Sequence, residues 1–299
     1  MDGILLINKE KSFTSHDVVA KVRKILNIKK VGHTGTLDPN ATGVLPLLLG
    51  DATKISKYLI NHDKEYEVLL QLGRKTTTAD IEGEIIEEKE VPDIIFSNAQ
   101  LEETLQQFIG KQQQIPPIYS AIKVNGKKLY NYARQGKQVE IEPRDIEIYS
   151  IKLISFNEKL KQIQFKVKCS KGTYIRSLCE DIAKKLGTVG YMRELNRSQV
   201  GEFNIKDTIT LEKLEALIKD KVTLEKSYFI TIENMFIENP SINISESELK
   251  KYLNGVKIPV KLEGSSNVCK VYSQNNFIGI GIIEGNALKR DLVINEHKI

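Results

Sequence analysis

Hydrophobic and polar positions along the chain follow two different periods, and each period predicts a type of element. Strand patterns occur in four segments, the fully apolar residues 4–7 and the alternating residues 64–72, 146–156 and 162–169. In the second of these, alternation places four side chains on one face, namely Tyr66, Val68, Leu70 and Leu72. We expect that face to pack against a core.

Helical spacing of apolar residues appears in four other segments, each with a recognisable boundary. Helices are predicted after a cap at residue 14 or 15, after Ser97 with Gln100 as its capping-box partner, and after Thr210. A fourth helix ends at Gly187, a residue type common at helix C-termini. Strands outnumber helices and do not alternate regularly with them, so the pattern favours an α+β fold.

The composition changes at two places along the chain. Residues 80–93 are rich in Asp and Glu, and we expect them to form a solvated turn and sheet edge. After about residue 230, short β-type runs at 269–272 and 277–283 are separated by Gly and Asn, which is typical of a small β-rich module. We place the domain boundary near Ile232, which divides the chain into residues 1–232 and 233–299.

Charge and cysteine content narrow the class of protein. The formal net charge of +5 permits a polyanionic partner without requiring one. The three cysteines have no ligand-like spacing, which favours free thiols in a reducing cytoplasm over disulfides or a zinc site. The apolar run near the N-terminus is too short for a signal peptide or a membrane span. We therefore expect a cytoplasmic protein with no membrane partner.

The segment VGHTGTLDPNATG, residues 31–43, surrounds one acidic side chain, Asp38, with small and turn-forming residues. Pro39 restricts the backbone directly after it, and the glycines allow tight bends and the close approach of another chain. Two interpretations stay open here, a surface turn or a loop that presents a carboxylate to a ligand. A phosphate-binding P-loop is excluded, because the segment does not end in Gly-Lys-Ser/Thr.

Two other segments carry candidate chemistry. In CSKGTYIRSLCEDI, residues 169–182, we expect Tyr174 and Arg176 at the end of a strand, where residues two apart share a face and can project into one pocket. The alternative is a core tyrosine beside a surface arginine. In KVNGKKLYNYARQGK, residues 123–137, five basic side chains and two tyrosines occur without any acid. This composition favours RNA contact over a merely solvated face.

Together these segments resemble the TruB family of transfer-RNA pseudouridine synthases. The resemblance covers nearly all of the first predicted domain in order, through the segments GILLINK (3–9), GHTGTLDPNATGVLPLLLGDATK (32–54), DKEYEVLLQLGRKTTTAD (63–80), IPPIYSAIKVNGKKLYNYARQG (115–136), CSKGTYIRSLCEDIAKKLG (169–187) and RELNRSQVGEF (193–203). The GHTGTLDPxATG and KGTYIR elements are specific to the family. The chain departs from the family pattern at Glu10, Glu194 and Asn196, which affects only local RNA contacts.

The resemblance implies a fold and a set of roles. The fold would be a large mixed, mainly antiparallel sheet flanked by helices, with an RNA-binding insertion at about residues 116–143 and a small C-terminal PUA-like β-barrel. The implied catalytic residues are Asp38, Tyr66 and Arg176. Arg176 pairs with the aspartate, and Tyr66 stacks on the flipped base and is a candidate acceptor of the C5 proton. Substrate binding is implied for His33, Tyr174 and Leu195. RNA contacts are expected from Lys9, Lys123, Lys127, Lys128, Tyr130 and Arg134.

The implied reaction converts one uridine, at position 55 in the T-loop of tRNA, into pseudouridine. It moves the ribose C1′ bond from N1 to C5 of uracil, with no net gain or loss of atoms, so no cofactor or metal is expected. One carboxylate suffices because the detached uracil returns as the nucleophile, whereas glycoside hydrolysis normally uses two. Asp38 could attack C1′, stabilise an oxocarbenium-like ribose or remove the C2′ proton. A pocket that excludes water would prevent hydrolysis.

Three competing interpretations make different predictions. A non-catalytic RNA-binding protein would keep its activity when Asp38 is replaced by Asn. A glycosidase-like or nucleotide-hydrolysing enzyme would release free base or phosphate. A relative that works with accessory proteins would act on other RNAs, but the chain carries no long lysine-rich tail of the kind such relatives often have. We therefore expect a monomeric enzyme of the tRNA T-arm stem-loop with no obligatory protein partner.

Overall fold

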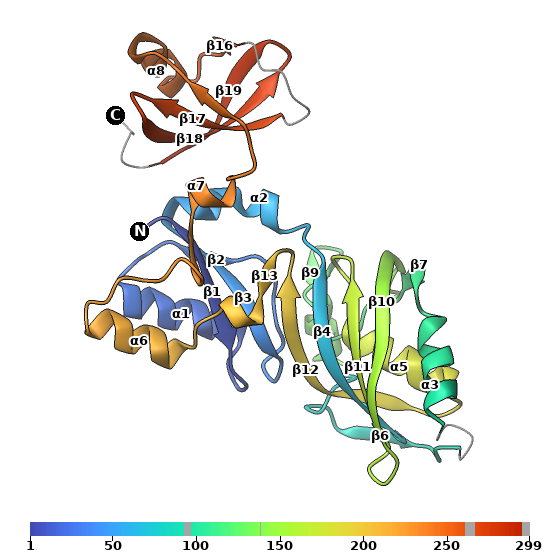
Figure 1. Ribbon diagram of the computed structural model, residues 1–299. Helices are drawn as coiled ribbons and strands as arrows, with labels where there is room; N and C mark the ends of the chain where they lie inside the picture. The colour runs from blue at the N-terminus through green and yellow to red at the C-terminus, as the bar shows by residue number, and fades with distance from the viewer. Residues whose placement is uncertain (93–96, 138, 261–266, 295–299) are drawn as a thin grey trace.

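A large mixed sheet forms the centre of the molecule (Figure 1). The computed structural model describes residues 1–92, 97–137, 139–260 and 267–294. Within these ranges, the sheet contains β1 (Gly3–Lys9), β2 (Val31–His33), β3 (Thr42–Leu49), β4 (Lys64–Leu72), β7 (Gly110–Gln114), β10 (Arg144–Asn157), β11 (Gln162–Cys169), β12 (Gly190–Val200), β13 (Phe203–Asn204) and β14 (Phe229–Thr231). Its order is β14-β1-β3-β12-β4-β11-β10-β7, with β2 beside β3 and β13 beside β12. All of these pairings are antiparallel except that of β12 with β3.

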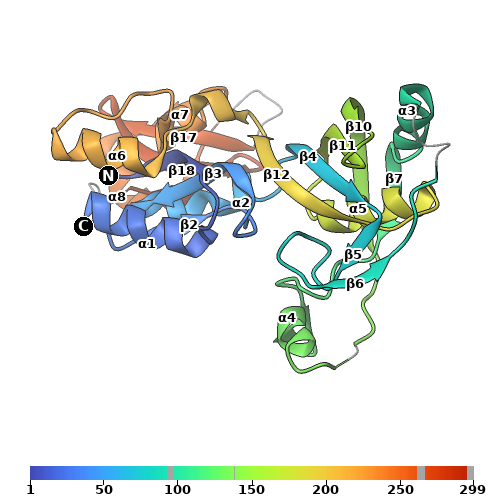
Figure 2. The same ribbon diagram turned by 90° about the horizontal axis from the view of Figure 1, so that it is seen from below.

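Helices cover each half of this sheet. The helical segments are α1 (Ser15–Leu26), η1 (Gly50–Ile55), α2 (Ser56–Leu59), α3 (Asn98–Gln106), α4 (Leu129–Ala133), α5 (Ile175–Lys185), η3 (Ile205–Asp207), α6 (Leu211–Lys219), α7 (Ile232–Met235) and α8 (Glu246–Leu253). Helices α1 and α6 lie together beside β1 to β3, whereas α5 and α3 pack on β12 and β10 (Figures 1 and 2). The α+β prediction, with a mainly antiparallel sheet, is confirmed.

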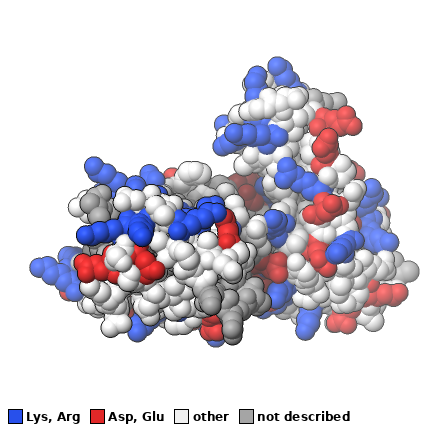
Figure 3. Space-filling view, turned by 90° about the horizontal axis from the view of Figure 1, so that it is seen from above, with Lys and Arg blue, Asp and Glu red and all other residues white. Residues whose placement is uncertain are grey.

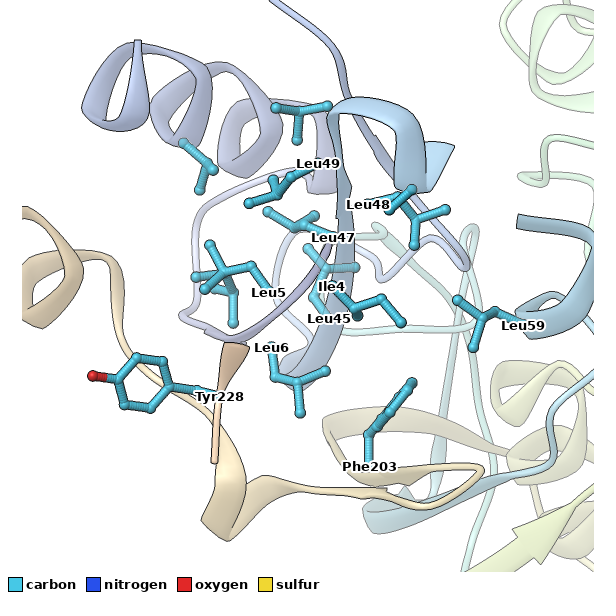
Figure 4. Packing of buried hydrophobic residues seen from close by; sticks show 14 of the residues in the cluster. Ile4, Leu5, Leu6, Leu45, Leu47, Leu48, Leu49, Leu59, Phe203 and Tyr228 are labelled. Carbon is cyan, nitrogen blue, oxygen red and sulfur yellow. The ribbon is translucent and has the colours of Figure 1, made fainter. Parts of the chain in front are cut away.

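The first core lies between the β1–β3 half of the sheet and its helices (Figure 4). Strands β1 and β3 are almost entirely buried, because apolar side chains point to both faces. Leu5, Leu47 and Tyr228 belong to this cluster, and Phe203 closes it near the turn after β12. This buried half carries the N-terminal end of the loop that contains Asp38.

The second core lies between α5 and the strands β4, β10, β11 and β12. The predicted alternation of β4 is confirmed, since its buried face carries Tyr66, Val68, Leu70 and Leu72. Leu178 and Ile182 of α5 pack against that face. The second half of the sheet therefore presents Tyr66 at the end that lies nearest the first core.

Two short hairpins extend from the sheet. Strands β5 (Arg74–Thr76) and β6 (Ile85–Glu88) form one, and β8 (Lys123–Val124) and β9 (Lys127–Lys128) form the other. The second hairpin and α4 belong to the predicted insertion, which projects away from the sheet in Figure 2. The acidic side chains of residues 82–90 are exposed, as predicted, while Asp93 lies outside the described residues.

A separate five-stranded sheet follows near the C-terminus, in the order β15-β17-β18-β19-β16. Its strands are β15 (Ser241–Asn243), β16 (Ile258–Pro259), β17 (Val268–Ser273), β18 (Asn276–Glu284) and β19 (Ala287–Val293), which confirms the predicted β-rich module. Tyr58 beside α7 donates a hydrogen bond from its hydroxyl to Asp291 Oδ2 at 2.8 Å, which links this module to the first core. We propose that Ile232 marks the domain boundary.

Helix ends follow the predicted capping residues with one difference. Thr14 and Thr210 cap α1 and α6 through their side chains, as the sequence indicates. Ser97 accepts a hydrogen bond from the Gln100 N–H, but its hydroxyl, and not its backbone N–H, donates to the Gln100 side chain. The reciprocal half of the predicted capping box is therefore wrong. In the described part of the chain, no helix has the length and apolar content that a membrane span requires.

Candidate active site

The loop that carries Asp38 connects β2 to β3 and joins the two cores. Leu37 and Ala41, on either side of the carboxylate, are buried in the second core. Ser15, at the start of α1, accepts a hydrogen bond from the Leu37 N–H at 2.9 Å and donates one to the Leu37 carbonyl at 3.2 Å. The Ala41 N–H donates to the Asp38 carbonyl at 3.1 Å, which closes a turn. These contacts fix the backbone of Asp38, while its side chain keeps 34% of its surface exposed.

Two nitrogens of the Arg176 guanidinium contact the Asp38 carboxylate. The Arg176 Nε atom lies 3.1 Å from Asp38 Oδ2, and Nη2 donates to Asp38 Oδ1 at 3.3 Å. The guanidinium also donates to the carbonyls of Thr78 and Tyr119, at 3.3 and 3.0 Å. A side chain held on all edges in this way has one orientation. The predicted pairing of Asp38 with Arg176 is present in the structure.

Asp80 is a third member of this ion-pair network, and the prediction that it is solvated is wrong. Its side chain is buried, and Oδ2 lies 3.6 Å from Arg176 Nη1. Its other oxygen, Oδ1, accepts hydrogen bonds from the Thr78 hydroxyl at 2.6 Å and the Glu82 N–H at 3.0 Å. A buried carboxylate requires such partners. The sequence pattern did not indicate the burial of Asp80, because the acidic residues that follow it in the same stretch are exposed.

The balance of these charges determines how readily Asp38 ionises. Burial raises the pKa of Asp38 above its ordinary value and is the largest influence. The Arg176 guanidinium opposes that rise, the Asp80 carboxylate adds to it, and Lys9 opposes it more weakly. Ionisation of Asp38 therefore depends on Arg176.

Lys9 lies beneath the Asp38 loop, and its burial disfavours the RNA contact that was predicted for it. The side chain is fully buried, and Nζ donates to the carbonyls of Glu10 and Pro39, each at 2.9 Å. Burial lowers the pKa of Lys9 to about 8, with the Asp38 carboxylate acting in the opposite direction. The sequence pattern did not indicate this role, because Lys9 ends an apolar strand and a charged residue at a strand end is usually solvated. Lys9 supports the backbone directly after Asp38.

Tyr66 and Leu195 form an apolar wall beside the loop. Both belong to the second core with Leu37, and each exposes 8% of its surface. Burial raises the pKa of Tyr66 to about 12, although the charge and hydrogen bonding of Arg197 lower it in part. Tyr66 is therefore a neutral phenol near neutral pH. Tyr66 and Leu195 therefore share a cluster with Leu37, the neighbour of Asp38, and their pocket roles stay predictions.

Tyr174 and Arg176 lie at the start of a helix, so the prediction that both end a strand is wrong. Strand β11 ends at Cys169, and the turn through Gly172, with φ +82°, leads to Tyr174 as the N-cap of α5. Side chains two apart in a helix do not share a face. Gln114 holds the Tyr174 backbone in both directions, accepting from its N–H at 2.8 Å and donating to its carbonyl at 3.1 Å. Arg176, in the first turn of this helix, contacts Asp38, while Tyr174 is half-buried at the N-cap.

His33 ends β2, directly before the loop. Its ring is half-buried and contacts the edge of the His16 ring, with 5.5 Å between ring centroids. Among the described residues, its buried Nδ1 atom has no hydrogen-bond partner. Burial lowers the pKa of His33, which favours the neutral imidazole.

The predicted RNA-contacting residues of the insertion are grouped on one projecting segment. Lys123, Lys127, Lys128 and Arg134 are exposed, and Tyr130 lies with the Lys128 ammonium and the Arg134 guanidinium each 5.5 Å from its ring centroid. None of these cations forms an ion pair with a described carboxylate. Figure 3 shows Lys and Arg side chains gathered on this projection. The root of the insertion reaches the candidate site through the Tyr119 carbonyl.

Comparisons with known proteins give the family of the chain. Three family models match in succession, "TruB family pseudouridylate synthase (N terminal domain)" at residues 23–175, "tRNA pseudouridylate synthase B C-terminal domain" at residues 176–238 and "Pseudouridine synthase II TruB, C-terminal" at residues 240–289. The fold and these matches define a pseudouridine synthase, an isomerase. The chain belongs to the TruB family.

Individual relatives extend over most of the chain. A protein of Caldanaerobacter subterraneus subsp. tengcongensis named tRNA pseudouridine synthase B is 44% identical over 97% of this chain and 98% of its own. One of the same name from Oceanobacillus iheyensis is 46% identical over 87% of this chain and 85% of its own. Among solved structures, the "Crystal Structure of a Cbf5-Nop10-Gar1 Complex" contains a chain with a TM-score of 0.67 and 25% identity, covering 96% of this chain and 83% of that one. This likeness supports the fold.

Proposed function

We propose that this enzyme isomerises the uridine at position 55 in the T-loop of tRNA to pseudouridine, with Asp38 as the carboxylate that acts at the ribose. The observation that carries the proposal is the two-point contact between Arg176 and Asp38 at 3.1 and 3.3 Å. It supplies one ionisable carboxylate, fixed by its backbone and partly open to a ligand. The relatives named tRNA pseudouridine synthase B support the choice of RNA.

The chemistry breaks the C1′–N1 bond and forms a C1′–C5 bond. C5 loses its proton and N1 of the product takes one up, so no atom is gained or lost overall. Three actions of Asp38 fit its position, namely covalent attack at C1′, stabilisation of positive charge on the ribose and removal of the C2′ proton. Each requires an ionised carboxylate, which Arg176 favours and burial opposes. Tyr66 and Leu195 support the exclusion of water that the reaction needs, because attack by water would leave an abasic site.

Tyr66 acts in this proposal as the surface on which the extruded uracil stacks. Its raised pKa keeps the phenol protonated near neutral pH, which disfavours a standing phenolate base. Kinetics of Tyr66→Phe with C5-deuterated uridine would test this. We expect binding to be retained, because the ring still stacks, and the C5 step to be slowed, because the side chain loses its hydrogen bond with Arg197. A normal rate in this variant would remove any role for the hydroxyl.

Access to the target uridine requires it to leave its stack, at a cost of about a few kcal/mol. The exposed cations and Tyr130 of the insertion would hold the T-arm and repay part of this cost. His33 would occupy the space that the base leaves, which a neutral imidazole does better than a charged one. The enzyme would act as a monomer on the tRNA alone.

Position mapping tests this function. The purified protein is incubated with an unmodified tRNA transcript, and pseudouridine is located by position, beside a transcript with cytidine in place of the target uridine. Pseudouridine at the T-loop position alone supports the proposal. Release of free uracil would instead indicate a hydrolase, and binding without modification would indicate a non-catalytic RNA-binding protein.

A further inference from the structure

Arg197 is a buried cation at the meeting point of the two cores. It lies on β12 and is 2% exposed. Its Nε atom donates to the Val44 carbonyl at 2.8 Å, and Nη2 donates to the Gly35 carbonyl at 3.2 Å. These carbonyls lie on either side of Asp38 along the chain, so one guanidinium ties together both ends of the loop. In the described part of the chain, no carboxylate forms an ion pair with Arg197.

The same residue also faces the strand that carries Tyr66. Arg197 and Tyr66 are directly opposite in the antiparallel register of β12 with β4. On its other side, Arg197 is opposite Gly43 in the parallel register of β12 with β3. Gly43 has φ +107°, and a Cβ atom there would lie 2.2 Å from the Arg197 carbonyl oxygen. The close approach of these strands therefore requires glycine and places the loop, β12 and Tyr66 around one side chain.

A buried guanidinium without a carboxylate is costly, because it loses its hydration. An apolar side chain would fill the same space without that cost. What the guanidinium adds is a rigid set of donors with fixed directions, which an apolar or flexible side chain lacks. Two of these donors bind the carbonyls at the two ends of the loop that carries Asp38.

We propose that Arg197 is a positioning residue, which holds the two ends of the Asp38 loop and the Tyr66 phenol in a single arrangement. The role in the reaction rests on the proposed function, in which Asp38 acts at the ribose and Tyr66 stacks on uracil. Misplacement of a reacting group by about 1 Å can lower a rate by about 100-fold. We therefore expect Arg197→Met to lower the single-turnover rate at saturating tRNA by about that factor, with little change in KM.

The rates of three single variants and one double-mutant cycle test this positioning role. Arg197→Lys keeps the charge but reaches fewer acceptors, so we expect a loss of about 10-fold, intermediate between wild type and Arg197→Met. Arg193→Met, the same change on the same strand, is the matched control and should leave the rate unchanged. When Tyr66 is already replaced by Phe, adding Arg197→Met should lower the single-turnover rate by a factor at least about 10-fold smaller than in the wild-type background. The two losses should not multiply, because the two side chains act together.

Hydrogen exchange supplies a readout that does not depend on activity. Faster exchange in a peptide that spans residues 34–44 is expected for Arg197→Met, and unchanged exchange there overturns the proposal. Equal losses in the wild-type and Tyr66→Phe backgrounds, or a full rate in Arg197→Met, also overturn it. If Arg197→Met does not fold, the rate and exchange of Arg197→Lys decide in the same way. An inactive wild type with altered exchange in the variant would contradict the proposed function alone.

Discussion

Replacing Arg176 with alanine removes a cation that contacts both carboxylates of the site, half-buried Asp38 and buried Asp80. Its Nε atom lies 3.1 Å from Asp38 Oδ2, and its Nη1 atom lies 3.6 Å from Asp80 Oδ2. Without it, Asp38 stays partly buried and faces the charge of Asp80, and both effects favour the protonated form. The pKa of Asp38, already raised by burial, therefore rises further in Arg176→Ala.

The size of the effect follows from the geometry. Two unit charges about 4 Å apart interact by about 4 kcal/mol at an effective dielectric constant of about 20. The Asp38 side chain keeps 34% of its surface exposed, so solvent screening removes part of this interaction. We expect ionised Asp38 to lose about 2–3 kcal/mol relative to its protonated form. The rate should therefore be lower by up to about 30- to 150-fold on the low-pH side of the profile.

The assay is single-turnover release of tritium from C5 of the target uridine, measured between pH 5.5 and 9. In the proposed function, activity requires ionised Asp38 and falls as the pH drops. The low-pH limb of the Arg176→Ala profile should therefore move to higher pH. The loss relative to wild type should therefore shrink as the pH rises. Arg176→Lys is the control, because it keeps the charge and should lose less. An equal loss at every pH would refute the electrostatic reasoning.

Three further predictions concern neighbouring groups. Asp80→Asn removes a like charge and should move the low-pH limb to lower pH, while looser orientation of Arg176 lowers the plateau rate by about 10-fold. The double variant Lys127→Ala, Lys128→Ala should weaken tRNA binding and reduce the slope of log affinity against log salt by about 1–2, with kcat unchanged. The lowered pKa of Lys9, about 8, means that the unfolded state binds more protons than the native state between about pH 8 and 10.5. Wild type should therefore gain about 1–2 kcal/mol of stability from pH 7.5 to 9.5 that Lys9→Met does not.

Each of these has an outcome that contradicts it. For Asp80→Asn, a limb that moves to higher pH would show that Asp80 does not oppose ionisation of Asp38. For the insertion, Lys226→Ala, which changes an exposed lysine elsewhere, is the control. An equal salt slope in Lys226→Ala and in the Lys127→Ala, Lys128→Ala double variant would show that the insertion lysines do not contact the RNA. For Lys9, urea unfolding that gives the same pH dependence in wild type and Lys9→Met would show that the ammonium is not shielded.

Periodicity predicted the elements well where one face of each is buried. Strands β4, β10 and β11 and helices α5 and α6 follow from apolar spacing, because a buried face requires a strict period. The position of Tyr174 was wrong for a local reason. A strand, a glycine turn and a helix N-terminus are joined within six residues, and the sequence pattern cannot place that boundary.

In the candidate site, the sequence predicted the residues that lie in specific motifs and missed the buried charges. Asp38, Arg176 and Tyr66 belong to specific motifs. Asp80 and Arg197 are buried charges, and their burial depends on partners from distant parts of the chain, which no local pattern reveals. A weak signal was present for each, since Asp80 ends a motif segment and Arg197 lies two residues from Leu195 on an inward strand face.

The central claim, that Asp38 acts at the ribose, is tested most directly with Asp38→Asn, which keeps the shape of the side chain and removes its charge. Wild type and variant are incubated in excess with C5-tritiated tRNA transcript, and tritium release and pseudouridine at the T-loop position are followed together, with tRNA binding measured in parallel. We predict that Asp38→Asn binds the tRNA and neither releases tritium nor forms pseudouridine. Modification by Asp38→Asn at the wild-type rate would contradict the account.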